Sequence, residues 1–186
     1  MSTNRKTQKR AQSVLGLTLN DGQLRAFHVT RAKGGLEVVK AANAALTLDL
    51  LHPEPELVGR EIKNHLDAAG IRERNCVVGI PPRWVMTQQT KLPDMPEEDK
   101  VSFLQIEAEK GFPVDPAQLQ IAQSFQRSTA GSYVTQLAVR REQIDQLTAV
   151  LKAAGLKAVS FSLGLAVLPK AIPPAGSGGR ISVAVD

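Results

Sequence analysis

The stretch that most restricts the fold is a proline-interrupted segment at residues 84–113, WVMTQQTKLPDMPEEDKVSFLQIEAEKGFP. Its first seven residues are rich in β-forming and alternating polar side chains, which predicts a strand. Pro93 and Pro96 end that strand, and the acidic run after them places negative charge where a helix N-terminus favours it. A helix is therefore expected from residue 97 until a glycine stops it. Three side chains of this helix are expected to face a core: Val101, Leu104 and Ala108.

The residues before this segment predict a small α/β unit. Two β-rich runs flank Asn20-Asp21-Gly22, whose last two residues accept the positive φ of a tight hairpin turn. A third β-rich run follows, then a helical pattern, then a short apolar run typical of a strand buried on both faces. The expected elements are strands at 13–19, 24–30 and 36–46, a helix at 53–69 and a strand at 75–80.

The residues from 84 to 163 predict a second unit in the order strand, helix, two strands, helix, strand. Alternating apolar residues indicate strands on either side of the loop at 128–132, and apolar residues at helical spacing over 144–154 indicate the second helix. This βαββαβ order is that of a ferredoxin-like sandwich, so a sheet with two helices on one face is expected.

The sequence resembles the type IV pilus assembly protein PilM family. The residues that carry the resemblance are Leu92-Pro93-x-Met95, the acidic turn after them, Glu107-Ala108 and Phe112-Pro113. The cytoplasmic domain of the type II secretion protein GspL is a more distant likeness. The resemblance implies an actin-like (ribonuclease H-like) half-domain at 13–83 and 164–186, with an SHS2-type insert at 84–163. It covers only the first half of that family, so the second half is expected to be missing.

In an actin-like fold the opening hairpin is the first phosphate loop, which needs an acid on the first strand and small residues in the turn. The resemblance aligns Thr18 with the acid and Asn20 with a glycine. Thr18 has no charge to hold a magnesium-bound water, and Asp21 would repel a phosphate. Asp186 matches the acid of the second phosphate loop. We therefore expect no cofactor, with ATP and Mg²⁺ bound only if a longer chain completes the site.

The resemblance also implies a function. PilM-like proteins bind the short N-terminal tail of the membrane protein PilN in a groove between the two units, so a non-catalytic scaffold of a pilus or secretion platform is expected. The alternative is a nucleotide-binding actin-like ATPase, complete only in a longer chain. By analogy the tail would contact four residues: Trp84, Met86, Phe112 and Pro113. The alternative interpretation is that these side chains pack in the core or at the hinge.

Charge and hydropathy suggest where the protein acts. The net charge is +5, and four basic residues lie in an arm at 1–12 that lacks apolar periodicity and is expected to be disordered: Arg5, Lys6, Lys9 and Arg10. The arm is interpreted either as a solvated tail or as a contact for anionic lipid. Nucleic-acid binding ranks below both, because no aromatic platform accompanies the arm. With no apolar run long enough for a span and no signal peptide, a cytoplasmic protein is expected. The resemblance implies that it is peripheral to the inner membrane.

No catalytic or metal site is visible in the sequence. The single Cys76 lies in an apolar run, and three histidines without zinc spacing give no ligand set. No nucleophile with a base, and no triad, is visible either. We therefore expect that the protein is not an enzyme.

Overall fold

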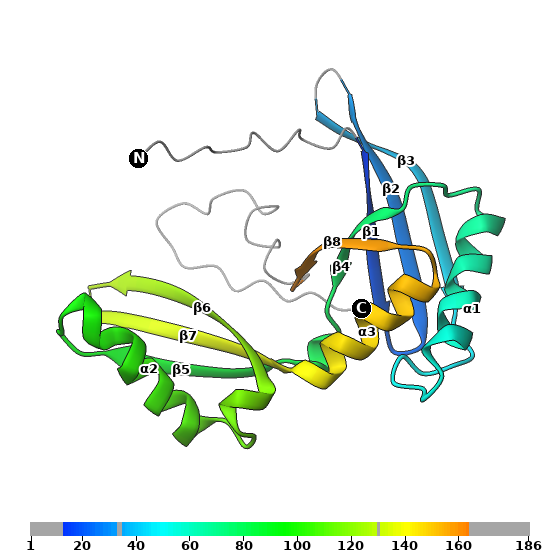
Figure 1. The fold of residues 1–186 in the computed structure, drawn as a ribbon. Helices are drawn as coiled ribbons and strands as arrows, with labels where there is room; N and C mark the ends of the chain where they lie inside the picture. The colour runs from blue at the N-terminus through cyan, green and yellow to red at the C-terminus, as the bar shows by residue number, and fades with distance from the viewer. Residues whose placement is uncertain (1–12, 33–34, 130, 164–186) are drawn as a thin grey trace, which may run out of the picture.

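The computed structural model describes residues 13–32, 35–129 and 131–163, and these form two lobes joined by a short link (Figure 1). The first lobe has a five-stranded sheet in the order β3-β2-β1-β4-β8 and the helices α1 and α3. Its elements are β1 (Ser13–Asn20), β2 (Gln23–Ala32), β3 (Gly35–Ala45), α1 (Pro55–Ala68), β4 (Asn75–Gly79), α3 (Arg141–Ala153) and β8 (Lys157–Ser162). The second lobe has β5 (Met86–Leu92), α2 (Glu97–Gly111), the 3-10 turn η2 (Pro116–Gln118), β6 (Leu119–Ser128) and β7 (Gly131–Arg140).

The predicted hairpin opens the first lobe. Asp21 and Gly22 have φ values of +48° and +72°, so the two turn residues take the left-handed conformation that a two-residue hairpin requires. β1 then pairs antiparallel with β2 and β2 with β3, which confirms the predicted meander. On β1 the alternate side chains Leu15, Leu17 and Leu19 are almost fully buried, so one face of the sheet is apolar and points to the helices.

The two helices of the first lobe cover that buried face and pack against each other. α1 contributes Val58, Ile62 and Leu66 to the core, as the helical spacing predicted. At Gly59 the helices approach so closely that a Cβ there would lie 2.5 Å from Cβ of Ala153 on α3. The absence of a side chain at Gly59 therefore sets the distance between α1 and α3.

The second lobe is smaller and its interior is partly polar. β5, β7 and β6 form an antiparallel sheet, and α2 packs on one face of it (Figure 1). Gln88, Gln136 and Gln123 stand directly opposite one another on these strands, and we call them the glutamine row. Gln136 is 1% exposed, and its Nε2 donates to the carbonyl oxygen of Leu104 on α2 across 3.2 Å. Gln88 Nε2 likewise donates to the Glu107 carbonyl across 2.9 Å.

The predicted βαββαβ insert at 84–163 is wrong in its last third. β8 pairs parallel with β4, which places Phe161 opposite Val78 in the first sheet. α3 belongs to the same core, because its buried side chains Leu147, Val150 and Leu151 pack with those of α1. The chain therefore returns to the first lobe near Arg140, and the second lobe has three strands and one helix.

One predicted core residue of α2 is also misplaced. Val101 is 74% exposed, whereas Leu104 and Ala108 are buried as expected. The helix begins at Glu97 after Pro96 and ends at Gly111, in agreement with the sequence signals. No helix in the described ranges has the length and apolar character that crossing a membrane needs.

Candidate functional site at the junction of the lobes

The hairpin turn predicted to be a degenerate phosphate loop lies beside the link between the lobes. Thr18 is exposed at the end of β1, and its cross-strand neighbours are Arg25 and Gly79. The side chain of Asn20 donates to the Asp21 carboxylate across 2.8 Å. These residues do not fit a magnesium-bound phosphate, because the strand offers a neutral hydroxyl and the turn offers a carboxylate.

Asp21 instead forms an ion pair that holds the link. Arg83 lies in the 3-10 turn η1 (Pro82–Trp84), which leads from β4 into β5. Its Nη1 is 2.9 Å from Oδ1 of Asp21, and its Nη2 is 3.8 Å from Oδ2 of Asp49. The guanidinium group thus connects the link with the hairpin turn and with the loop that precedes α1. Sequence reasoning missed Arg83, because a lone arginine after two prolines carries no motif.

The four predicted tail-binding residues are not brought together on one surface. Trp84 is 6% exposed and belongs to the core of the first lobe. Phe112 is 7% exposed and belongs to the core of the second lobe, where half-buried Met86 also packs. Of the four, only Pro113 is exposed. Trp84 and Phe112 are therefore core residues of the two lobes. That the four residues bind a partner stays a prediction.

A cavity of about 670 Å³ does lie between the lobes. Its lining comes from η2 and the end of β7 in the second lobe and from the start of α3 in the first: Ala117, Gln118, Arg140, Arg141, Glu142, Asp145 and Gln146. We call it the junction cavity. Arg141 crosses the junction, since its Nε donates to the Ala117 carbonyl across 3.1 Å and its Nη1 to Gln120 Oε1 across 3.2 Å.

The charged side chains at the junction cavity differ in whether they have a partner. Arg141 is held by its hydrogen bonds to the second lobe, whereas Glu142 and Asp145, on the first turns of α3, are exposed and form no ion pair with any described residue. A ligand entering here would meet these two carboxylates and the exposed guanidinium group of Arg140. No pattern in the sequence indicated this cavity, because its two walls are more than twenty residues apart in the chain.

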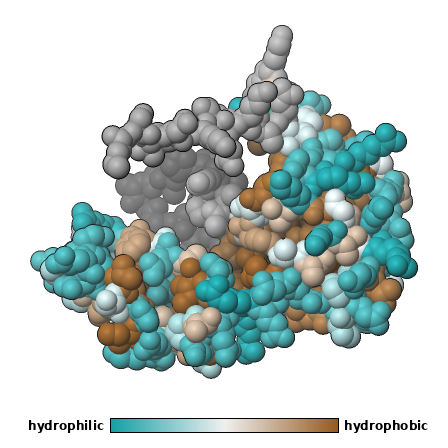
Figure 2. Space-filling model, in the orientation of Figure 1, coloured by the Kyte–Doolittle hydropathy of each residue, from teal (hydrophilic) through white to brown (hydrophobic). Residues whose placement is uncertain are grey.

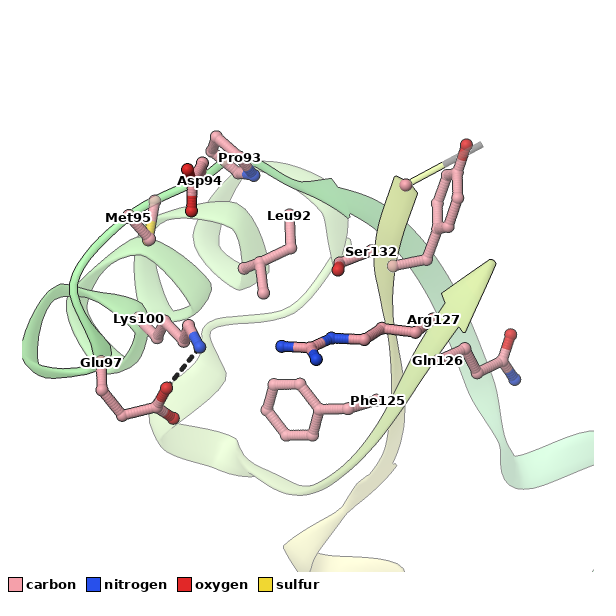
Figure 3. Close-up of a pocket in the computed structure, with 12 residues that line it drawn as sticks. Leu92, Pro93, Asp94, Met95, Glu97, Lys100, Phe125, Gln126, Arg127 and Ser132 are labelled. Atoms are coloured by element: carbon pink, nitrogen blue, oxygen red, sulfur yellow. Dashed lines mark hydrogen bonds and ion pairs between the residues drawn. The ribbon is translucent and has the colours of Figure 1, made fainter. Parts of the chain in front are cut away.

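A second cavity, of about 720 Å³, lies at the far end of the second lobe between α2, β6 and the turn after β5. Figure 3 shows the Phe125 ring and the Arg127 guanidinium directed into it from β6, opposite the ion pair of Lys100 with Glu97. The face of this lobe that Figure 2 shows is mixed: its apolar areas, at lower left, are separate patches among hydrophilic side chains.

The described residues offer no metal centre and no activated thiol. No group of three or more His, Cys, Asp or Glu side chains within the described ranges could hold a metal ion. Cys76 is fully buried, and burial raises the pKa of its thiol to about 11, so the thiolate form is suppressed at neutral pH. Two predicted features, the phosphate-loop acid Asp186 and the basic arm at 1–12, lie outside the described residues.

The strand order, the helix-covered face and the lobe inserted between β4 and α3 define a two-lobed α/β protein consistent with an actin-like fold. No protein-family model matches the sequence, and no curated protein matches it. Among solved structures, a chain of the PilM-PilN type IV pilus biogenesis complex superposes with a TM-score of 0.69 over 83% of this chain, at 23% identity. The cytoplasmic domain of EpsL, an inner-membrane component of the Vibrio cholerae type II secretion system, superposes with a TM-score of 0.55 over 80%, at 14% identity.

These similarities confirm the predicted likeness to PilM and, more distantly, to GspL at the level of the fold. The chain spans about half the length of the chains it matches, 48% of the first and 56% of the second.

Proposed function

We propose that this chain is a non-catalytic scaffold at the cytoplasmic face of a type IV pilus or type II secretion platform, where it binds a short cytoplasmic tail of an inner-membrane protein. The observation that carries the proposal is the superposition of 83% of the chain on a protein solved in complex with PilN. Fold alone does not carry an activity, so the proposal also rests on the side chains at the turn and at the junction.

The hairpin turn supports a structural role over nucleotide binding. An ATPase would need an acid at the position of Thr18 and a turn free of negative charge. The turn instead carries Asp21, whose carboxylate forms an ion pair with Arg83. A phosphate that approached the turn would be repelled by this carboxylate. The alternative, an actin-like ATPase completed in a longer chain, would have to work without that first acid.

The junction cavity is the site we propose for the tail. Cytoplasmic segments next to a membrane span are enriched in Lys and Arg, and a tail that begins at its N-terminus also carries an amino group. The exposed carboxylates of Glu142 and Asp145 complement such charges. A tail bound there would contact both lobes, so binding would stabilise their relative placement.

The test is a titration of the chain with a labelled peptide of the tail of a candidate membrane partner encoded beside it. Reversing both acids (Glu142→Lys with Asp145→Lys) should weaken binding by at least about tenfold, because desolvated charge pairs contribute more than about 1.4 kcal/mol. The matched control reverses two acids on the exposed side of α2 (Glu98→Lys with Glu109→Lys) and should leave binding unchanged. Equal binding by both variants would exclude the junction cavity as the tail site.

The basic arm gives the proposal a second, separable part. Arg5, Lys6, Lys9 and Arg10 would add about 1 kcal/mol each near an anionic membrane surface. Sedimentation with vesicles containing anionic lipid should fall when residues 1–12 are deleted and when salt is raised. Unchanged sedimentation after the deletion would remove the membrane contact and leave tail binding untouched.

A further inference from the structure

The outer edge of β6 is unprotected. β6 is the last strand of the second sheet, and nothing in the described part of the chain pairs with its outer side. It is ten residues long, and its register with β7 has no bulge. From Leu119 to Gln126 it contains no proline and no charged side chain. Natural edge strands usually carry such features, because open N–H and C=O groups otherwise pair with another chain.

The other described edges are protected. β5 carries Lys91 and is followed by Pro93. β3 carries Glu37 and Lys40, and its pairing with β2 is irregular at His28. β8 starts with a lysine, and its pairing with β4 is also irregular. β6 has one charged side chain of its own, Arg127, but it lies near the end of the strand and leaves the eight residues from Leu119 to Gln126 uncharged.

The side chains of β6 are arranged symmetrically about Gln123. Two residues away on either side are the apolar Ile121 and Phe125, which point to the same face of the sheet as Gln123. One residue away on either side are the small Ala122 and Ser124 on the other face. An antiparallel copy of the strand, related by a two-fold axis through Gln123, would place Ile121 opposite Phe125 and Ala122 opposite Ser124.

We propose that β6 is a self-association edge, where a second copy of this chain pairs antiparallel with β6 about a two-fold axis at Gln123. The two sheets then become one six-stranded sheet with both α2 helices on the same face. Ile121 lies opposite Phe125 of the second copy, and the Phe125 side chain, 58% exposed in one chain, is buried by an aliphatic neighbour.

Charge and hydrogen bonding both favour this register. The one charged side chain of β6, Arg127, stands opposite Leu119 of the second copy. The two Arg127 side chains are then eight residue steps apart, about 26 Å, so they do not repel. The glutamine row, which ends at exposed Gln123, continues across the axis into the row of the second copy. Stacked glutamine amides hydrogen-bond along such rows.

The first test introduces charged side chains on β6 of the full chain and measures the dimer Kd by sedimentation equilibrium. In the proposed register Ala122 lies opposite Ser124 of the second copy, so Ala122→Lys with Ser124→Lys puts like charges face to face and should raise the dimer Kd at least about tenfold. The matched variant, Ala122→Lys with Ser124→Glu, puts opposite charges face to face and should keep or lower the Kd. Lysines at Thr87 and Gln89 on the opposite edge should have no effect.

The second test is a cross-link at the axis. Gln123→Cys should form a disulfide-linked dimer under mild oxidation, because the introduced thiols face each other across the axis within reach of a disulfide. Gln126→Cys is the control, since its two thiols would be six residue steps, about 20 Å, apart. Native Cys76 does not interfere because it is fully buried.

Four results would overturn the proposal. The first is a wild-type dimer Kd weaker than about 1 mM. The second is the same Kd for the two charge variants, and the third is equal cross-linking at positions 123 and 126. Protection of the β6 amides from hydrogen exchange by an added peptide, with the chain still monomeric, would assign the edge to another protein and overturn the proposal as well.

Discussion

Arg83 lies 2.9 Å from the carboxylate of Asp21, and this ion pair joins the link between the lobes to the hairpin turn where an actin-like fold would bind phosphate. Both side chains are largely exposed, 45% and 70%. The pair therefore contributes little to global stability, and its effect is to restrict where the link can lie.

A double-mutant cycle on Asp21→Asn and Arg83→Gln should give a coupling energy of about 1 kcal/mol or less in the free energy of unfolding. Hydrogen exchange at the amides of residues 83–86 should rise in either variant, because the link loses its contact with the turn. A coupling energy well above this value, or unchanged exchange in both variants, would contradict the role assigned to the pair.

Trp84→Ala should lower the free energy of unfolding by about 3–5 kcal/mol, because the indole is buried in the core of the first lobe. Pro113→Ala, at an exposed position, should change it by less than about 0.5 kcal/mol. Urea unfolding followed by circular dichroism measures both. A stable Trp84→Ala variant that had lost only tail binding would favour the surface role predicted from the sequence.

Gly59→Ala should destabilise the first lobe by about 1–3 kcal/mol, although alanine is normally the better helix former. The added methyl would lie 2.5 Å from Cβ of Ala153 and 2.7 Å from the Val150 carbonyl oxygen, so α1 and α3 would have to separate. Arg60→Ala, one residue along the same helix and exposed, is the control and should be close to neutral. Thermal unfolding of the two variants checks the prediction, and a stabilised Gly59→Ala variant would contradict it.

Glu73 should make stability depend on pH. Burial raises its pKa, but hydrogen bonds from the Ser13 hydroxyl, the amides of Asn75 and Arg74 and the Asn75 side chain outweigh burial and hold the pKa below its ordinary value of 4.5. The stabilisation is therefore present above pH 4.5 and is lost as the pH falls through the lowered pKa.

Urea midpoints of wild type and Glu73→Gln, compared from neutral to acid pH, test this. Wild type should be the more stable of the two at neutral pH, and the difference should shrink below about pH 4.5. A difference that does not change with pH would mean that the carboxylate charge is not what stabilises the loop.

The sequence predicted elements well where the signal is local. The hairpin at Asp21-Gly22 and the start of α2 after Pro96 depend on neighbouring residues only, and both lie where expected. The partners of α3 and β8 could not be found in this way. β8 pairs with β4, about eighty residues earlier, and its alternating pattern suits either sheet equally well.

The candidate site was predicted less well, for two physical reasons. Aromatic side chains next to prolines suit both a binding surface and a core, and Trp84 and Phe112 proved to be buried in two different cores. Val101 was expected inside because it lies at helical spacing from Leu104 and Ala108. α2 instead packs on Gln88 and Gln136, which donate to its backbone carbonyls, so the helix buries fewer apolar residues.

Parallel calorimetric titrations of the chain with the tail peptide and with Mg²⁺-ATP distinguish binding of a partner tail from binding of a nucleotide. The proposed function predicts saturable binding of one peptide per chain and no heat from the nucleotide, because Thr18 supplies no charge and Asp21 is paired with Arg83. Tight binding of Mg²⁺-ATP without binding of the peptide would contradict it.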